Sequence, residues 1–242
     1  MILNDLMEYM ESIAPRALAE EWDNVGLLVG DAQKPIQTVV VALDATHDAI
    51  AFAQSENADV IVTHHPLLFA PVRTVTAPSA LYALCASGMA LFAAHTNLDA
   101  AAGGVNDALA RTLGLRDVQP FEGLGRVGRL PAAMDATAFA AHVNNALDTR
   151  VQVRCADRPI ETVAVVGGSG GDFLSSVTAD AFVTGELKHH EWLEAPQDVT
   201  VVVGGHYHTE AVVLASLSAR IAAAFPSLRV VLYRGNAPYK TV

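Results

Sequence analysis

The chain has 242 residues, of which 52% are hydrophobic and 17% charged, a composition that supports a sizeable buried core and excludes an intrinsically disordered protein. Fifteen Lys and Arg against 26 Asp and Glu leave a formal net charge of −11, which argues against general binding to nucleic acid or to anionic membranes. The apolar runs are far shorter than the roughly 18 residues that a membrane-spanning helix needs, so we expect a soluble protein without a membrane partner.

The N-terminus lacks the basic region and the unbroken apolar segment of a secretory signal, and it instead predicts an amphipathic helix with Leu6, Met10 and Ile13 on one face. Cys85 and Cys155 are far apart and form no CxxC pair, so they predict neither a disulfide framework nor a thiolate zinc site. Both are flanked by apolar or small residues and are expected to pack as ordinary apolar side chains. These features favour a cytoplasmic protein.

In the first half of the chain, short β-rich runs alternate with helical patterns. The predicted strands are 26–30, 38–44, 58–63 and 89–95. Helices are predicted after Thr46 and after Pro78, and a third has Val105, Leu109 and Leu113 at four-residue spacing, as in a helix that covers a sheet. This order is typical of an α/β fold.

Residues 116–131 break the periodicity with two prolines and three glycines, and predict a boundary between two halves. The second half repeats the alternation. Its predicted elements are a helix near 135–147, strands at 150–154, 161–166, 180–184 and 199–203, a long helix at 207–225 and a strand at 228–233. We expect residues 1–120 with 200–242 to form a first α/β domain that carries the metal ligands described below, and residues 121–199 a second, smaller one.

Two histidines stand at the end of an apolar strand. The run VIVT at 60–63 leads into His64 and His65 and is closed by Pro66, which cannot continue a strand ladder. The carboxyl end of a strand is the edge at which ligands bind in open α/β sheets. Taken alone, the pair also fits polar residues that begin a loop.

Two other strand ends carry a histidine with a carboxylate. His95 and Asp99 follow the predicted strand 89–95 and are four residues apart, so in a helix they point the same way. His206 and Glu210 have the same spacing at the start of the long helix, after a Gly-Gly turn. Taken singly, each could be a helix cap or a histidine satisfied within the fold.

Together, three strand ends that deliver imidazoles and carboxylates predict a joint metal site. Imidazole with carboxylate suits Zn, Mn, Fe, Co or Ni better than Mg or Ca, which prefer oxygen ligands alone. Five ligands shared by two divalent ions leave open positions, as in catalytic sites. The five candidates are His64, His65, Asp99, His206 and Glu210.

Three other segments invite a functional reading. One follows a strand and holds Glu186, Lys188, His189, His190 and Glu191; it is either a solvated helix start or a loop that faces the substrate. GLGRVG at 123–128 matches the dinucleotide pattern GxGxxG, but Pro131 and the absence of a following helical pattern favour a glycine-rich turn. GGSGGDF at 167–173 could cradle an anion with backbone amides, although a tight turn is the better interpretation.

The chain resembles the Nif-three-like family, also named GTP cyclohydrolase type-two homologues. The match runs from Trp22 to Glu210, and its motifs, in order, are WDNVGLLVG, VTHHPLLF, AAHTNLDAAAGGVNDALA, GLGRVG, DAFVTGELKHHE and GGHYHTE. The resemblance implies two α/β halves with mixed sheets, a dinuclear metal centre at the strand ends between them, and a homohexameric ring. It also implies the same five ligands, with Glu210 as the bridging group and His95 beside them.

The leading functional hypothesis is a hydrolase that uses two divalent transition-metal ions per chain and a metal-activated water on a small anionic substrate, such as a nucleotide, a phosphoester or a GTP-like purine. Candidates for proton transfer are His95, His208 and Glu186. His189 and His190, which follow Glu186 closely in the sequence, are further candidates. The alternative is a non-enzymatic metal-binding ring or a scaffold that binds partners.

Overall fold

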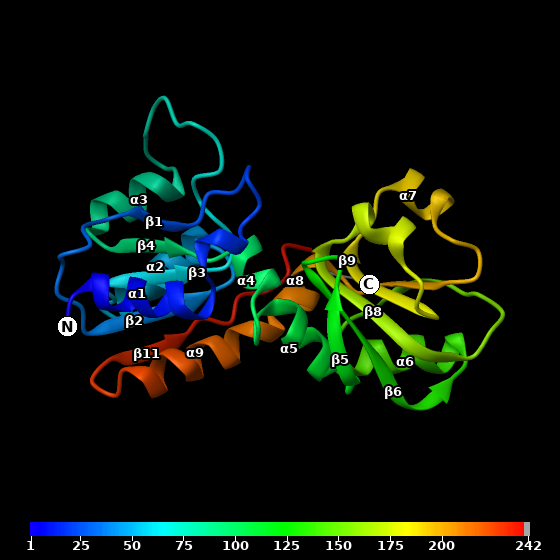
Figure 1. The fold of residues 1–242 in the computed structure, drawn as a ribbon. Coiled ribbons are helices and arrows are strands. Elements are labelled where there is room, and N and C mark those ends of the chain that lie inside the picture. Colours follow the sequence, from blue (N-terminus) through cyan, green and yellow to red (C-terminus); the bar gives the residue numbers. More distant parts are fainter. Residues whose placement is uncertain (240–242) are drawn as a thin grey trace. The chain divides into compact units, whose positions relative to one another are not determined.

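The computed structural model describes residues 1–239 and contains two compact units, each built on its own sheet (Figure 1). The first unit comprises residues 1–102 and 214–235, and the second comprises residues 103–213 with the segment from 236 onward. Both sheets contain parallel and antiparallel pairs, which confirms the predicted α/β class with mixed sheets.

The first unit has a five-stranded sheet in the order β1-β4-β3-β2-β11, in which only β1 runs antiparallel to its neighbour. Its strands are β1 (Gly26–Val29), β2 (Thr38–Ala42), β3 (Val60–Thr63), β4 (Ala90–Ala93) and β11 (Arg229–Leu232). Its helices are α1 (Leu3–Ile13), the 3-10 turn η1 (Arg16–Leu18), α2 (His47–Ser55), α3 (Ala80–Ser87), α4 (Thr96–Ala100) and, from Leu214, α9 (Val212–Ala224).

Local sequence explains these elements. Strands β2 and β3 are buried along their whole length, as expected of valine-rich parallel strands covered on both faces. The N-cap Thr46 accepts a hydrogen bond from the Ala49 amide at 3.1 Å and begins α2. Leu6 and Met10 of α1 are buried, which confirms the predicted amphipathic face. Cys85 and Cys155, which we expected to pack in the interior, are both exposed.

The second unit has a six-stranded sheet in the order β5-β6-β8-β9-β10-β7, with a parallel centre formed by β8, β9 and β10. Its strands are β5 (Arg116–Phe121), β6 (Gly125–Met134), β7 (Gln152–Arg154), β8 (Ile160–Ser169), β9 (Ala181–Glu186) and β10 (Thr200–Val203). Its helices are α5 (Val105–Thr112), α6 (Ala136–Leu147), the 3-10 helix η2 (Gly171–Ser176), α7 (His189–Glu194) and α8 (His206–Glu210).

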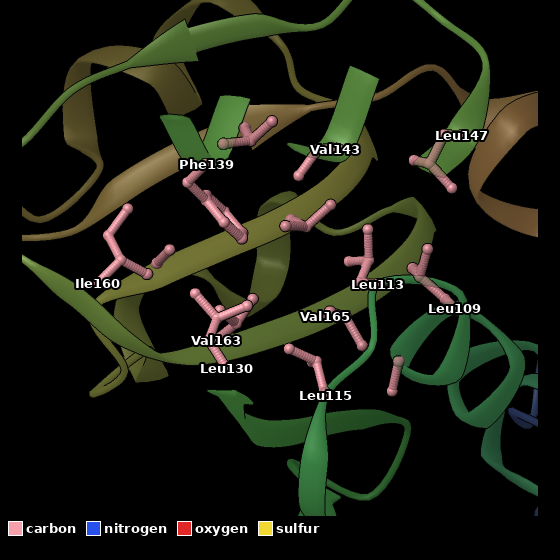
Figure 2. Close-up of a cluster of buried hydrophobic side chains, with 14 of the residues drawn as sticks. Leu109, Leu113, Leu115, Leu130, Phe139, Val143, Leu147, Ile160, Val163 and Val165 are labelled. Carbon is pink, nitrogen blue, oxygen red and sulfur yellow. The ribbon is translucent and has the colours of Figure 1, made fainter. Parts of the chain in front are cut away.

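One hydrophobic core of this unit lies between α6 and the sheet (Figure 2). Phe139 and Val143 of α6 pack with Val163 and Val165 of β8, and Leu109 of α5 joins them. A second cluster packs around Phe182 of β9 and is separate from the first. Because side chains alternate along a strand, the two clusters account for two faces of one sheet.

The unit boundaries differ from the predicted domain boundaries. The chain changes unit after residues 102, 213 and 235, whereas the prediction placed the changes after 120 and 199. Helix α5 and strand β10 explain the difference, because both contribute buried side chains to the core of the second unit. His206 and Glu210 therefore belong to the second unit, in contrast to our prediction of one domain that carries every ligand.

The segment 116–131, which we interpreted as a boundary, forms strands β5 and β6 of an antiparallel hairpin. Its turn uses Glu122 and Gly123, both with positive φ (47° and 74°). Pro120 is tolerated because β5 is an edge strand, and Pro131 falls within the register shift between Arg129 and Met134. The GxGxxG pattern thus occupies a strand-turn-strand, and the helix that a dinucleotide site requires is replaced by β6.

The long helix predicted at 207–225 is divided into α8 and α9 by a turn at Ala211. Among the described residues, none of the helices combines the length and apolarity needed to cross a bilayer.

Candidate metal-binding clusters

The first unit brings three histidines together at adjacent strand ends. Strands β3 and β4 are parallel neighbours, with Thr63 opposite Ala93, so the residues that follow them meet at one edge. His64 and His65 follow β3, and His95 follows β4. One nitrogen of each ring lies within 4.8 Å of the others, a spacing that could hold a metal ion. We call these three residues the histidine cluster.

Each ring of the histidine cluster is anchored through Nδ1. His64 Nδ1 lies 2.9 Å from the Ala94 carbonyl oxygen, His65 Nδ1 lies 2.7 Å from Asp44 Oδ1, and His95 Nδ1 lies 2.8 Å from Asp23 Oδ1. Carbonyl and carboxylate oxygens accept hydrogen bonds, so each Nδ1 carries the proton and donates it. In a neutral imidazole that is protonated at Nδ1, Nε2 is the nitrogen that bears the lone pair, and this is the tautomer of metal-ligating histidines held by an oxygen partner.

Asp99 extends the histidine cluster with a carboxylate. It lies on the single turn of α4, where its amide donates to the His95 carbonyl at 3.0 Å, and only 6% of it is exposed. Its Oδ1 is 3.6 Å from His64 Nε2. As the four-residue spacing predicted, the helical turn directs Asp99 to the edge occupied by the histidines.

Asp23 anchors His95 from a fully buried side chain. It also accepts hydrogen bonds from the Thr96 amide at 3.0 Å and the Thr96 hydroxyl at 2.5 Å. Burial alone would raise the pKa of Asp23, but the hydrogen bonds from Thr96 and His95 outweigh it and hold the pKa below its ordinary value. Burial, with His64 nearby, lowers the pKa of His95, so the ring is neutral at pH 7.

The second unit gathers a histidine between two glutamates, and we call His206, Glu186 and Glu210 the glutamate cluster. Glu186 ends β9, and α8 begins shortly after the neighbouring parallel strand β10. His206 Nδ1 lies 3.3 Å from Glu186 Oε1, and His206 Nε2 lies 3.1 Å from Glu210 Oε2. Glu210 is 3% exposed, whereas the side chain of Glu186 is 58% exposed.

Two glycines leave room for the glutamate cluster. A Cβ on Gly168 would lie 2.2 Å from Glu210 Oε1, and one on Gly185 would lie 2.8 Å from the Cα of His206. Gly168 also has φ +66°, and its amide donates to the Thr209 hydroxyl on α8 at 3.1 Å. The glycines at 167–168 thus serve the close approach of α8 to β8, which differs from both the anion cradle and the tight turn considered for this segment.

The other candidate residues lie apart from these clusters. Glu191 is buried and caps α7, with its Oε2 accepting from the Lys188 amide at 2.6 Å, while His189 and His190 are exposed. This matches the solvated helix start. His208 packs edge-on against Tyr207, with ring centroids 5.4 Å apart, and belongs to none of the possible metal groups found among residues 1–239.

The sequence analysis missed the two anchoring carboxylates. Asp44 is the last residue of the predicted strand 38–44, so its position at a third strand end could have been noticed. Asp23 lies before a strand, and only its contact with His95 shows its role.

Comparisons with known proteins give a consistent result. A sequence profile of Duf34/NIF3 (NGG1p interacting factor 3) matches residues 1–237. A Clostridium perfringens protein named GTP cyclohydrolase 1 type 2 homolog is 34% identical in an alignment 241 positions long that covers 91% of each chain. A protein of the same name from Methanocaldococcus jannaschii is 36% identical over 87% of this chain and 90% of its own. The crystal structure of a Bacillus cereus protein related to NIF3 matches with a TM-score of 0.94 at 22% identity, covering 100% of this chain and 99% of that one.

Proposed function

Since the chain belongs to the Duf34/NIF3 family, we propose that it is a metal-dependent hydrolase that uses two divalent transition-metal ions on a small anionic substrate. The observation that carries the proposal is the histidine cluster, in which each of the three rings has its Nδ1 held by an oxygen acceptor. Histidines that merely begin a loop have no need of three such anchors. The anchors orient the rings and keep them in the tautomer that ligates a metal.

The donor set fits transition metals. Neutral imidazoles together with carboxylates suit Zn, Fe, Mn, Co or Ni. In this proposal His64, His65, Asp99, His206 and Glu210 would hold the two ions, and Glu210, whose carboxylate has two oxygens, would serve both. His95 is anchored by a carboxylate in the same way as His65. The metal content of the His95→Ala variant distinguishes a ligand from a residue that lies beside the ligands.

The protein's own groups have separate tasks in this proposal. When bound, two divalent ions lower the pKa of a water and polarise the bond that it attacks. Asp23 and Asp44 orient His95 and His65, and the lowered pKa of His95 keeps that ring neutral. Glu186, exposed and within reach of His206, is a candidate for moving a proton, and His95 and His208 are the others. Two divalent cations would make this region of an acidic protein attractive to an anion.

The test combines metal content with turnover. Protein expressed with added metal should carry about two transition-metal ions per chain and hydrolyse one or more members of a panel of nucleotides and phosphoesters. His65→Ala should lose both properties, and Leu193→Ala, at an exposed site in the second unit, should lose neither. Metal binding without metal-dependent turnover would favour a non-enzymatic metal-binding ring or scaffold, and absence of metal would refute the ligand assignment.

A further inference from the structure

Two large aromatic side chains of the first unit are exposed beside the histidine cluster. Trp22 is 59% exposed and Phe69 is 56% exposed. Their rings contact each other in a tilted arrangement with centroids 5.6 Å apart. Each also meets His95 edge-on, at 6.1 Å for Trp22 and 6.4 Å for Phe69. We call Trp22 and Phe69 the aromatic platform.

The segment that carries Trp22 is fixed to both the histidine cluster and the loop of Phe69. Asp23, the next residue, holds the ring of His95. Asn24 donates a side-chain hydrogen bond to the Leu68 carbonyl at 2.5 Å, next to Phe69. Of three consecutive residues, Trp22 presents an exposed ring, Asp23 orients His95, and Asn24 holds the loop that carries Phe69. These contacts give the aromatic platform a fixed position relative to the histidine cluster.

The surface continues into an apolar hollow. A cavity of about 440 Å³ is lined by Asn24, Phe69, Leu81 and the loop residues around Pro71. Two exposed aromatic side chains beside residues that could ligate a metal favour a ligand with a flat, apolar face, since stacking on aromatic rings removes such surface from water. The ligand must also be able to present an anionic group to the histidine cluster.

We propose that Trp22 and Phe69 bind the planar ring of the substrate by stacking, and that the substrate is a nucleotide or a similar phosphorylated heteroaromatic compound. This inference rests on the proposed function, because it takes the metal ions at the histidine cluster as the site of the anionic group. Stacking on the aromatic platform favours ligands that carry a base, but it discriminates little between bases, because every base has a π face.

Tryptophan fluorescence gives a direct test. The chain has two tryptophans, Trp22 and Trp192, so Trp192→Phe leaves Trp22 as the only reporter. Metal-loaded Trp192→Phe protein is titrated with AMP, GMP and ribose 5-phosphate. We expect saturable quenching by both nucleotides, and no quenching by ribose 5-phosphate, which has the phosphate but lacks the base.

Variants then separate stacking from other roles. Calorimetry should show that Trp22→Ala weakens GMP binding about 10-fold or more, that Trp22→Phe keeps most of the affinity, and that Leu193→Ala changes nothing. Metal content should stay at the wild-type level in all three. Phe69→Ala should weaken binding in the same direction as Trp22→Ala.

Several results would overturn the inference. Equal quenching by ribose 5-phosphate, or no quenching by any probe in protein that holds its metal, would show that no base stacks on Trp22. A change of oligomeric state in Trp22→Ala with unchanged GMP affinity would make the aromatic platform an interface between copies of the chain. Loss of metal in Trp22→Ala would give Trp22 a structural role. Wild-type protein that fails to bind metal would instead count against the proposed function.

Discussion

The histidine cluster and the glutamate cluster are held in opposite ways. In the first unit, each imidazole of the histidine cluster is anchored through Nδ1 by an oxygen acceptor. In the second unit, His206 lies between two carboxylates, one buried and one exposed. The first arrangement fixes the orientation of the rings, whereas the second supplies negative charge. In the proposed function, the imidazoles would favour a transition metal and the carboxylates would balance the charge of the ions.

The largest effect is expected from the buried carboxylate of the glutamate cluster. Glu210→Ala should remove both metal ions and abolish activity, because a bridging carboxylate serves two cations at once. His95→Ala should keep most of the metal, with affinity reduced about 10- to 100-fold, as for a group that supports the ligands. Elemental analysis after dialysis measures both. Retention of both ions in Glu210→Ala, together with their loss in His95→Ala, would make His95 a ligand and refute the bridge.

The next effect concerns the space that the glutamate cluster requires. Gly168→Ala places a Cβ 2.2 Å from Glu210 Oε1, so the Glu210 carboxylate must move. Gly114→Ala is a matched control in the same unit, since Gly114 has φ +70° against +66° for Gly168 but meets nothing within 4 Å. We expect Gly168→Ala to be about 1–3 kcal/mol less stable than Gly114→Ala in denaturant unfolding of metal-free protein, and to bind metal poorly. Equal stability would mean that Glu210 moves freely.

The two carboxylates that anchor the histidine cluster, Asp23 and Asp44, should differ in how much their loss reduces stability. Asp23 is fully buried and accepts from His95 and Thr96, so Asp23→Ala should cost at least about 2 kcal/mol of stability and also weaken metal binding. The side chain of Asp44 is 46% exposed, so Asp44→Ala should leave stability within about 0.5 kcal/mol and lower metal affinity about 10-fold. Metal titration and urea unfolding separate the two effects. An unchanged affinity in Asp44→Ala would show that His65 needs no anchor.

The smallest effect on metal binding is expected from a carboxylate without a proposed metal role. Asp180 accepts from the Thr162 amide and hydroxyl, each at 2.8 Å, and pairs with Arg158. Burial would raise the pKa of Asp180, but these donors outweigh it and lower the pKa. A depressed folded pKa stabilises the protein above the unfolded value of about 3.9, and this contribution is lost as the pH falls through the folded pKa.

Asp180→Asn should therefore be about 1–2 kcal/mol less stable than wild type at pH 7, with the difference narrowing below about pH 4. Asp198→Asn is the control, because Asp198 contacts the same Arg158 at 3.7 Å but its side chain is 75% exposed. Its effect should stay within about 0.5 kcal/mol. A difference for Asp180→Asn that widens as the pH falls would contradict the direction of the shift.

The sequence predicted the features that depend on strand ends. The apolar run VIVT and Pro66 predicted that His64 and His65 lie at the end of a strand. The four-residue spacing of His95 and Asp99 predicted that one turn of helix directs both residues to the same side. Such features are local, because a run of valines and the residue that ends it determine where the next side chain lies.

The features that the sequence did not reveal depend on contacts distant along the chain. Pro120 and Gly123 were interpreted as part of a boundary between two halves. Proline is tolerated in an edge strand, but the sequence alone does not show which strand lies at the edge of the sheet. The role of Gly168 depends on Glu210, 42 positions later, whose side chain fills the space next to it. The role of Asp23 depends in the same way on His95.

The position of strand β11 near the end of the chain affects how the first unit folds during synthesis. The strand pairs in parallel with β2, yet it lies near the end of the chain, after the whole continuous stretch of the second unit. On the ribosome, residues 103–213 of the second unit emerge before β11, and one edge of β2, a run of Thr, Val and Ala, is without its neighbour during that time. An apolar strand with an open edge is prone to pair with other chains. Chains that terminate early, before Arg229, should therefore aggregate through the first unit while the second remains folded.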